Sequence, residues 1–596
     1  MGRKKKEEII EEFIPSKYQK NIFDFIEHGV GNLVVEAVAG SGKTSTIVQA
    51  LKLIPIDKKI LFCAFNKDIV KELTKKIGKQ ENVDVRTVHS LGLLMLQRNF
   101  KDKELLINEN KYRQFVMSNL EYLSMLNFQQ MKFRDRLRFI DNTCNLINYC
   151  RYNLADTEIS SNSLVERHGI ELVGDEVIVA LEALKWGKTV LDEIDYTDMI
   201  WMPNILYLKP IGLQYDFVAV DESQDLSTAQ RELLLKCQKM GTRYMFLGDS
   251  SQCIYSFASA DPESFNKLKE IPNTISLPLS ISYRCPKNIV KFAQTLVPTI
   301  EANDNNKLDG EVLYNVKLEY IKDGDMVLCR NNAPLIKIYN DFIRMGRKCQ
   351  IRGKDIGMNL KRFAKTAHQE ELNSSLDKDG VFVRLYESLF EVRDKMIKQT
   401  GLDKHSVMNS SIILNKLDMI RTLEVLSEGI NTIDELNDRI TKMFSDKKSD
   451  GIKLSTVHKA KGLEAENVYI ACSSLMPSKS ATKKWEIEQE RNLMYVAYTR
   501  SKNKLGFIDE SDFKKFTDNS AESLKRIEEK VNYVLHKQSI DVIPTKYSSI
   551  PHIIPRKNVE TMFVKTNSKV ISDNKSSKEK SLLSIGKRKK TKLNRI

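Results

Sequence analysis

The chain has 596 residues, with 94 Lys and Arg against 79 Asp and Glu, which gives a net charge of +15 at pH 7. A single hydrophobic core rarely serves more than about 300 residues, so this length predicts several domains. The nine cysteines contain no CxxC pair, which argues against a zinc ribbon or an iron–sulfur cluster, and no apolar run approaches the ~20 residues of a membrane span. The positive charge favours an anionic partner, although Lys-rich solvated surfaces give the same balance without one.

Short apolar segments followed by turn residues and then by helical patterns occur in two parts of the chain. This alternation predicts parallel strands in α/β cores. The first set of predicted strands is Leu33–Val38, Ile60–Phe65, Phe217–Val220 and Tyr244–Leu247. The second set is Met326–Cys329, Ile452–Thr456 and Asn467–Ala471. Two parallel-sheet cores are therefore expected.

Two long stretches, at about 105–193 and 355–450, are charged, Leu/Ile-periodic and poor in Gly and Pro, which predicts a helical insertion in each core. From about Gln538 onward Ser, Lys, Asn and Pro dominate, and Gly586–Lys592 is strongly basic, which predicts a flexible basic tail. The predicted division is a first core (1–104 and 195–275), a first insertion (105–194), a second core (276–353 and 451–515), a reduced second insertion (354–450), and a C-terminal helix with the tail (516–596).

The segment Ala37–Thr44 has the composition of a phosphate-binding loop, with an intact GxGKT core. It follows a predicted strand and opens a predicted helix at Ser45–Lys52, which is the context that such a loop requires and that a chance glycine loop lacks. Its backbone N–H groups and the helix N-terminus would hold phosphate oxygens. Lys43 would bridge the β- and γ-phosphates of ATP, and the Thr44 hydroxyl would ligate Mg²⁺. The predicted ATP-binding residues here are Ala37, Val38, Ala39, Gly40, Ser41, Gly42, Lys43, Thr44 and Ser45.

The segment Phe217–Asp225 places carboxylates at the C-terminal tip of an apolar strand. Ligands bind at this edge of open α/β sheets. Asp221 would hold Mg²⁺ through water, and Glu222 would orient or deprotonate the attacking water. A solvated acidic turn is the alternative, but the phosphate loop on the same core disfavours it.

Further motifs occur in an order that resembles the UvrD-like branch of superfamily 1 DNA helicases, of the UvrD, Rep and PcrA type, over roughly residues 15–505. The resemblance implies two RecA-like P-loop cores, each with a helical insertion. It also implies ATP and Mg²⁺ as cofactors, and single-stranded and tailed duplex DNA as partners. The runs Ala64–Lys67 and Asp195–Met199 are closer to the F-box helicase and phage subgroups.

In the first core, four segments resemble family motifs: Pro15–Gln19 (the Q motif), Leu61–Lys67 (motif Ia), Arg86–Ser90 (motif Ib) and Leu247–Phe257 (motif III). The resemblance implies that Gln19 contacts adenine and that Gln252 senses the γ-phosphate. The DNA-binding residues that it implies here are Phe65, Asn66, Thr87, His89, Tyr255 and Phe257. His89 could instead be a core or capping histidine, and the two later aromatic residues could be ordinary core residues.

In the second core, the segments are Ser282–Cys285 (motif IV), Val327–Asn331, Leu454–Glu464 (motif V) and Glu490–Arg500 (motif VI). The resemblance implies that Tyr283 stacks on adenine and that Glu464 contributes to the ATP site. It implies that Arg284 and Arg500 are arginines facing the γ-phosphate. With Lys43, Glu222 and Gln252, these two arginines complete the predicted catalytic set. The DNA-binding residues that it implies here are Arg330, Thr456, His458 and Lys459.

Two positions depart from the family pattern. Ala258 and Ser259 stand where Arg-Gly is frequent, which puts one basic contact in doubt. Ser282 stands where Asn is usual, which puts a local turn in doubt. Neither position belongs to the predicted hydrolytic set.

The expected function is an ATP-dependent DNA helicase or translocase acting in replication, repair or recombination, with a 3′→5′ direction implied by the resemblance alone. A non-motor ATPase switch and an RNA helicase are the alternatives. The second insertion contains no closely spaced glycines, so weak duplex contact is expected, and efficient unwinding is expected to need a protein partner or several motors in line. An intracellular location is expected: cytoplasmic for a bacterial or phage protein, and nuclear or in a viral factory for a eukaryotic or viral one.

Overall fold

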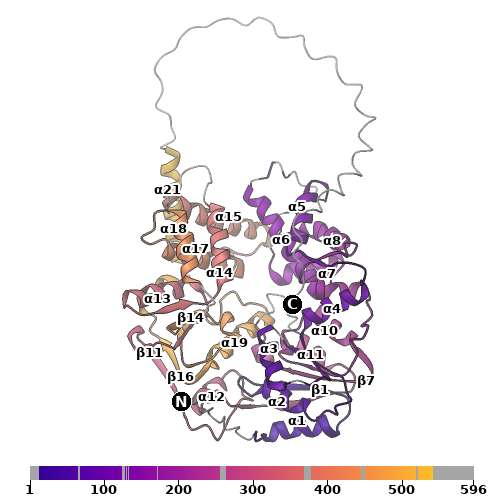
Figure 1. The fold of residues 1–596 in the computed structure, drawn as a ribbon. Helices are drawn as coiled ribbons and strands as arrows, with labels where there is room; N and C mark the ends of the chain where they lie inside the picture. The colour runs from indigo at the N-terminus through magenta and orange to yellow at the C-terminus, as the bar shows by residue number, and fades with distance from the viewer. Residues whose placement is uncertain are drawn as a thin grey trace, which may run out of the picture. The chain divides into compact units, whose positions relative to one another are not determined.

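The computed structural model (Figure 1) describes a chain that divides into two units, residues 1–536 and 537–596. The described residues are 13–64, 67–78, 80–123, 128, 130–131, 133–170, 172, 174–254, 263–367, 378–444, 450–518 and 521–540. All contacts discussed below lie within the first unit. None of the helices in these ranges is long and apolar enough to span a membrane.

The first sheet has six strands, and every neighbouring pair is parallel. In spatial order they are β3 (Val83–Thr87), β2 (Ile60–Ala64), β6 (Tyr215–Val220), β7 (Gln238–Gly248), β1 (Asn32–Ala37) and β8 (Thr274–Leu279). Alternate residues of the central strands face two different hydrophobic clusters, so both faces of the sheet are covered. One face packs against α1 (Lys17–His28), α2 (Lys43–Leu51) and α3 (Lys67–Ile77). The other packs against α4 (Val88–Asn99), α9 (Asp198–Ile205), α10 (Thr228–Lys236) and α11 (Ser264–Lys269).

The first insertion forms a helical body with a core of its own. It comprises α5 (Lys111–Leu123), α6 (Phe133–Asn153), α7 (Glu158–His168) and α8 (Glu176–Gly187), closed by the short parallel pair β4 (Leu106–Ile107) and β5 (Glu193–Ile194). Arg151 of α6 is fully buried and donates to both carboxylate oxygens of Asp195, at 2.6 and 2.7 Å. Lys111 of α5 pairs with the equally buried Asp198 at 2.7 Å. These buried pairs join the insertion to the segment that leads into α9.

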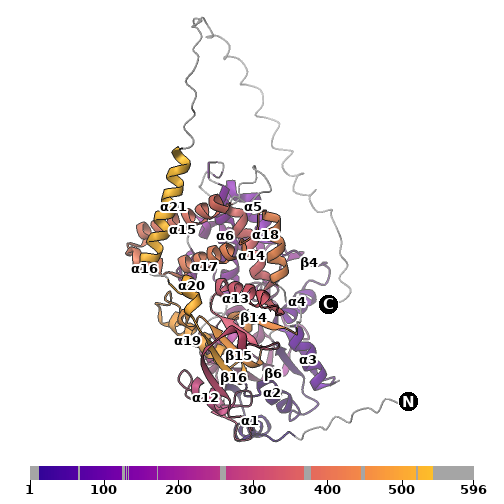
Figure 2. The same cartoon turned by 90° about the vertical axis from the view of Figure 1, so that its left-hand side faces the viewer.

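The second sheet also has six parallel strands. In spatial order they are β11 (Glu311–Val316), β16 (Ser501–Ile508), β15 (Ala465–Ala471), β12 (Met326–Cys329), β14 (Ile452–Thr456) and β13 (Cys349–Ile351). One face packs against α12 (Lys287–Ala293) and α19 (Lys484–Tyr498). The other packs against α13 (Asn332–Arg344), which Figure 2 shows close to β14. The pair β9 (Ile281–Ser282) and β10 (Glu301–Ala302) lies on the chain between the two sheets.

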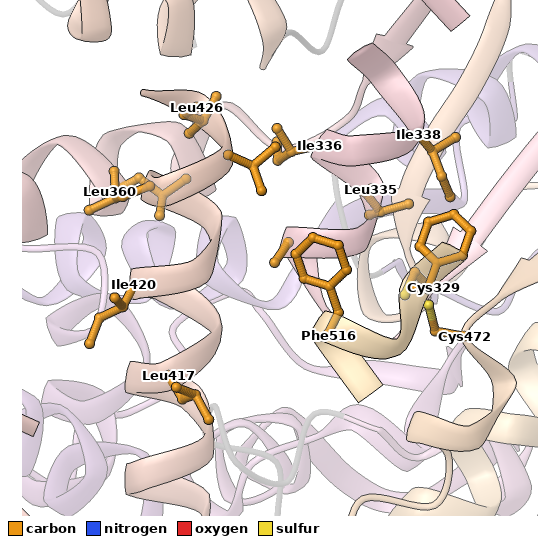
Figure 3. Close-up of a cluster of buried hydrophobic side chains, with 14 of the residues drawn as sticks. Cys329, Leu335, Ile336, Ile338, Leu360, Leu417, Ile420, Leu426, Cys472 and Phe516 are labelled. Atoms are coloured by element: carbon orange, nitrogen blue, oxygen red, sulfur yellow. The ribbon is translucent and has the colours of Figure 1, made fainter. Parts of the chain in front are cut away.

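The second insertion shares one hydrophobic core with the second sheet. It comprises α14 (Lys354–Ala367), α15 (Lys378–Thr400), α16 (Lys404–Met408), α17 (Ser411–Leu426) and α18 (Ile433–Met443). The core also takes side chains from α20 (Lys514–Thr517) and α21 (Ala521–Ile540). Figure 3 shows Leu417 and Ile420 of α17 on one side of this core and Leu335 of α13 on the other.

A half-buried carboxylate reinforces this junction. Asp418 of α17 accepts hydrogen bonds from the backbone N–H groups of Asn332 and Ala333, at 3.0 and 3.1 Å, and so caps α13. Orphan N–H groups at a helix start need such acceptors. The insertion and the second sheet are therefore one packed body.

The predicted fold class is confirmed: two α/β cores with parallel sheets, each interrupted by helices. All the predicted strands are present: β12 and β14 have the predicted ends, and the others are shifted; β7, for example, begins at Gln238 instead of Tyr244. The helix after the phosphate loop begins at Lys43, earlier than the predicted Ser45. β8 pairs with β1, so the first sheet extends to Leu279, beyond the predicted boundary at residue 275. The division into five regions otherwise stays a prediction, and the basic tail from residue 541 lies outside the described residues.

Candidate active site

The phosphate loop connects β1 to α2 and bends at two glycines. Gly40 and Gly42 have φ of +72° and +77°, a region that residues with a Cβ rarely adopt. A Cβ on Gly40 would also lie 2.5 Å from the Cβ of Arg284, so the loop approaches the chain after the first sheet too closely for any other residue. Gly42 caps α2, which directs the free N–H groups of the first turn into the loop.

Four predicted residues of the first core lie together at the C-terminal edge of the sheet. Lys43 Nζ is 3.2 Å from Glu222 Oε2, and Thr44 Oγ1 donates to Asp221 Oδ2 at 3.3 Å. Glu222 has φ of +52°, an unusual conformation for a residue with a side chain, and its N–H donates to Asp221 Oδ1. The first sheet thus brings one lysine, one hydroxyl and two carboxylates into contact.

The two carboxylates have opposite electrostatic environments. Burial raises the pKa of Asp221 to about 6, and the neighbouring Glu222 charge acts in the same direction. Burial would also raise the pKa of Glu222, but the Lys43 and Lys461 ammonium groups and the Gln224 amide lower it to about 2. Glu222 is therefore ionised at neutral pH. A cation bound next to Asp221 would stabilise the ionised form of its carboxylate.

The second core contributes Arg500 and Arg284. Arg500 is buried, and its Nη2 donates at 3.1 Å to Oε1 of Gln252, whose own amide donates to Asp249 Oδ2 at 2.6 Å. Burial and the neighbouring Arg284 lower the pKa of Arg500 to about 10, so it still carries its charge at pH 7. Arg284 pairs with Glu464 at 2.8 Å. The contact of Arg500 with Gln252 joins the two cores.

The predicted adenine residues Gln19 and Tyr283 both lie next to Gly42. Both are 3.9 Å from the position that a Cβ on Gly42 would take. Gln19 is buried, belongs to the capping box of α1 and donates to Thr46 Oγ1 at 3.0 Å. Tyr283 is 42% exposed, and its N–H donates to the carbonyl oxygen of Gly40. A side-chain amide and an accessible ring therefore lie next to the loop.

Two predicted DNA-binding residues lie at the start of α4. The Thr87 hydroxyl accepts the Ser90 N–H and caps the helix, and His89 lines a small pocket with Asp221, Glu222 and Asp225. Burial lowers the pKa of His89, and the Asp195 charge opposes this shift. His89 is therefore neutral at pH 7 and adjoins the carboxylate cluster.

The other group of predicted DNA-binding residues lies at the ends of β12 and β14, which are neighbours in the second sheet. Arg330 donates through Nε and Nη2 to Glu490, at 3.1 and 2.8 Å, and Glu490 also accepts the Ser478 N–H. Thr456 Oγ1 accepts the Lys459 N–H, and Lys459 pairs with Asp355 at 2.6 Å. Burial lowers the pKa of His458 well below its usual value.

The remaining predicted DNA-binding residues, Phe65, Asn66, Tyr255 and Phe257, lie outside the described residues, as do Ala258 and Ser259. Ser282 stands where Asn is usual in the family, and its contacts show that the local turn is nevertheless held. Ser282 Oγ donates to the Ala39 carbonyl oxygen at 2.8 Å and accepts the Cys285 N–H at 3.3 Å, so it holds the turn itself.

The structure adds two residues that have no role in the predictions from the sequence. Tyr495 Oη accepts the Ala39 N–H, and Lys461 Nζ contacts Asp225. Both lie inside segments that resemble family motifs, so the sequence already pointed to their neighbourhood. The sequence did not show which residues of the other core they contact.

Comparisons with known proteins agree with this geometry. The family model described as the UvrD/REP helicase N-terminal domain matches residues 18–272, and that of the UvrD-like helicase C-terminal domain matches residues 354–511. F-box DNA helicase protein 1 of Schizosaccharomyces pombe is 25% identical over 79% of this chain and 55% of its own length, so the chain spans about half of that relative.

Two bacterial relatives match over most of their length. ATP-dependent DNA helicase Rep of Buchnera aphidicola subsp. Schizaphis graminum is 20% identical over 82% of this chain and 92% of its own. ATP-dependent DNA helicase PcrA of Staphylococcus aureus is 22% identical over 80% of each chain. The chain therefore belongs to the UvrD-like family of superfamily 1 ATP-dependent DNA helicases.

Proposed function

We propose that this chain is a motor that hydrolyses ATP to move 3′→5′ along single-stranded DNA and separates duplex DNA in replication, repair or recombination. The observation that carries the proposal is that catalytic residues of the two cores lie close together. Lys43, Thr44, Asp221 and Glu222 lie together in the first core, and Arg500 of the second core reaches Gln252. Phosphoryl transfer needs this convergence of positive charge and an oriented carboxylate.

In this proposal the first core binds and activates ATP. Lys43 and the N–H groups from Ala37 to Ser45 hold the phosphates, and Gln19 and Tyr283 hold adenine by an amide contact and by stacking. Glu222 orients the attacking water and accepts its proton. Its low pKa means that the carboxylate is ionised at neutral pH and can accept a hydrogen bond from that water.

The residues present fit Mg²⁺ as the metal. Thr44 and Asp221 offer hard oxygen ligands 3.3 Å apart, and Asp221 is a buried carboxylate next to a second one. Within the described residues no cluster of three or more His, Cys, Asp or Glu side chains could hold a metal alone. Such a site suits Mg²⁺, which keeps waters and shares phosphate oxygens. When bound, it would neutralise charge on the phosphates.

The second core is proposed to complete the site only when the two cores close. Arg500 and Arg284 then face the γ-phosphate, and Glu464, which holds Arg284 in the structure, contacts the nucleotide. An arginine finger contributes roughly 10³–10⁵ to the rate of hydrolysis. Closure and chemistry are therefore coupled, and alternation between closed and open states moves the strand.

Single-stranded DNA is proposed to cross the ends of both sheets. Thr87, His89, Arg330, Thr456, His458 and Lys459 would contact it, together with Phe65, Asn66, Tyr255 and Phe257, whose surroundings lie outside the described residues. Contacts to phosphates position a strand, and aromatic side chains stack on any base at roughly 1–3 kcal/mol each. Binding should therefore depend little on DNA sequence.

The test of the hydrolytic assignment is Glu222→Gln, which keeps the shape of the side chain and removes its charge. The rate of DNA-stimulated hydrolysis should fall about 10²–10⁴-fold, while ATP and DNA still bind. Lys43→Ala should in addition weaken ATP binding. Glu232→Gln is a matched control, because Glu232 is a partly exposed carboxylate on α10. Near-normal hydrolysis by Glu222→Gln would refute the assignment.

Two further measurements separate the proposal from its rivals. Streptavidin displacement from the 3′ and 5′ ends of oligodeoxynucleotides reports the direction of movement, and displacement from the 5′ end is expected. Stimulation of hydrolysis by single-stranded DNA and by RNA of equal length identifies the preferred strand. A chain that binds ATP and DNA without any strand-dependent turnover would be a switch and not a motor.

A further inference from the structure

Lys461 joins the two cores by a buried ion pair. It lies three residues beyond His458, after the short helix η4 (His458–Ala460) that follows β14. Its Nζ is 2.5 Å from Asp225 Oδ2 and donates to the Gln252 carbonyl oxygen at 2.7 Å. The side chains of Lys461 and Asp225 are only 8% and 3% exposed. A lysine of the second core is thus fixed against two segments of the first.

Both of these segments lead directly to catalytic groups. Asp225 follows Gln224, whose Nε2 donates to Glu222 Oε2 at 2.6 Å and lies 3.4 Å from Asp225 Oδ2. The Gln252 side chain is the partner of Arg500. A movement of Lys461 would therefore displace the residues that orient Glu222 and Arg500.

Lys461 also belongs to the segment proposed to contact DNA. Thr456, His458 and Lys459 precede it within five residues, and the Lys459 N–H to Thr456 Oγ1 bond folds this segment into one turn. A strand held at that turn would move the turn together with Lys461. The segment from Thr456 to Lys461 therefore begins at the proposed DNA surface and ends at the carboxylate cluster.

We propose that Lys461 is a positioning residue, and that its ion pair with Asp225 transmits the presence of single-stranded DNA at the turn after β14 to Glu222. The inference rests on the proposed function. Asp225 depends on this partner, because its second oxygen, Oδ1, makes no hydrogen bond to any residue that the structure describes. Removal of either partner leaves the other charge buried without its ion-pair partner, so both changes should act on the same step.

The experiment compares Lys461→Met, Asp225→Asn and the double variant in the full-length protein. Hydrolysis is measured with and without oligo(dT), and so are the KM for ATP and the Kd for oligo(dT). The ratio of stimulated to unstimulated kcat should fall at least tenfold in each single variant. The KM and the Kd should stay within about threefold of the wild type. The double variant should be no worse than the poorer single variant, as expected for two residues in one interaction.

Two further variants serve as controls. Lys504→Met removes a lysine of the same sheet whose partner, Glu311, is largely exposed, and it should leave the ratio unchanged. Lys461→Arg keeps the charge and should restore part of the stimulation, which a role in packing alone would not predict. If Lys461→Met does not fold, Asp225→Asn, which preserves side-chain size, decides the question.

The outcomes separate this inference from the proposed function. A wild-type chain without DNA-stimulated hydrolysis would overturn the proposed function whatever the variants do. A stimulated wild type with unchanged ratios in both single variants would overturn the role of Lys461 alone. Additive losses in the double variant, or equal losses with and without oligo(dT), would do the same, because the pair would then not transmit DNA binding.

Discussion

The Ala39 N–H donates to Tyr495 Oη at 3.0 Å, although 456 positions separate the two residues. Tyr495 is fully buried, and burial raises its pKa well above the usual value, so it remains a neutral phenol. Ser282 Oγ donates to the carbonyl oxygen of the same Ala39. Both peptide groups of one phosphate-loop residue are thus held by side chains that follow the first sheet in the chain.

Tyr495→Phe should therefore loosen the phosphate loop without disturbing the core. Loss of one buried hydrogen bond costs about 1–3 kcal/mol, so we expect the KM for ATP to rise roughly five- to tenfold or more. Tyr498→Phe is the control, because Tyr498 lies on the same helix and packs against Phe292 and Phe507 through its ring. Steady-state hydrolysis at saturating oligo(dT) measures both variants, and equal KM values would contradict the expectation.

Arg330→Ala and Lys459→Ala should both weaken DNA binding but differ in stability. Arg330 neutralises the buried Glu490, and breaking such a pair costs up to about 3–5 kcal/mol. Lys459 and Asp355 form a more exposed pair, for which the usual value is about 0–1 kcal/mol. Urea unfolding and fluorescence anisotropy with labelled oligo(dT) give the two quantities. Equal unfolding free energies for the two variants would show that Glu490 does not need Arg330.

His458 and His89 should not add positive charge to the DNA surface at mildly acidic pH. Burial lowers the pKa of both rings, with Arg330 and Lys459 lowering that of His458 further. His458 therefore stays neutral between pH 8 and 6, and the shift of His89 acts in the same direction, so the salt dependence of oligo(dT) binding should be the same at both values. A steeper salt dependence at pH 6 would show that at least one ring is protonated in the folded chain.

The same depressed pKa predicts an acid-sensitive fold. The unfolded chain takes up protons on its histidines near pH 6.5 while folded His458 does not. The stability that this group contributes is therefore complete above pH 6.5 and is lost as the pH falls below it. The melting temperature of His458→Gln should fall less than that of the wild type between pH 7 and 5.5. Parallel curves would contradict the pKa shift.

The basic tail should add salt-sensitive DNA affinity and no hydrolytic activity. Residues 541–596 contain 14 Lys and Arg against 4 Asp and Glu. Truncation after Ile540 keeps all of α21, whose Leu524 and Val531 are buried in the second core. We expect unchanged DNA-stimulated kcat and a lower slope of log Kd against log salt. An unchanged slope would favour a docking or import signal instead.

The second insertion is predicted to contact duplex DNA only weakly, so translocation should be faster than unwinding. Its glycines are isolated in the described part: Gly357 packs within α14, and Gly401 and Gly429 lie in separate turns. Replacement of the insertion by a linker would destroy the shared core, so Arg362→Glu with Lys365→Glu on exposed positions of α14 is the better test. Single-turnover unwinding of a 3′-tailed duplex should change less than twofold. Loss of unwinding with intact translocation would refute the prediction.

The sequence predicted most of the central strands and missed the edge strands. β1, β2, β6 and β12 are largely buried and contain apolar runs, and β14 is buried except at Lys453. The edge strands β3, β8, β11 and β13 were not predicted, and neither was β16, which lies between β11 and β15. An edge strand is covered on fewer sides, so its sequence keeps polar residues, as in Thr274–Leu279 and Val83–Thr87.

The candidate site shows the same division between local and long-range information. Residues within one motif, such as Lys43 and Thr44, could be assigned because spacing along the chain fixes their relation. The partners of Tyr495 and Lys461 could not, because these contacts depend on how two separately folded sheets face each other. The spacing within a motif predicts how its own residues are arranged, but it does not predict which residues of the other core they contact.

The strand order of the second sheet has a consequence for synthesis on the ribosome. β12 lies between β14 and β15, and both are translated only after the whole second insertion, more than a hundred residues later. The first sheet is complete once β8 has emerged. A nascent chain therefore carries a finished first half and an unpaired β12 while more than a hundred further residues are translated. Non-local pairing of this kind folds late, so the second half should become protease-resistant in one step, only after β14, β15 and β16 have emerged.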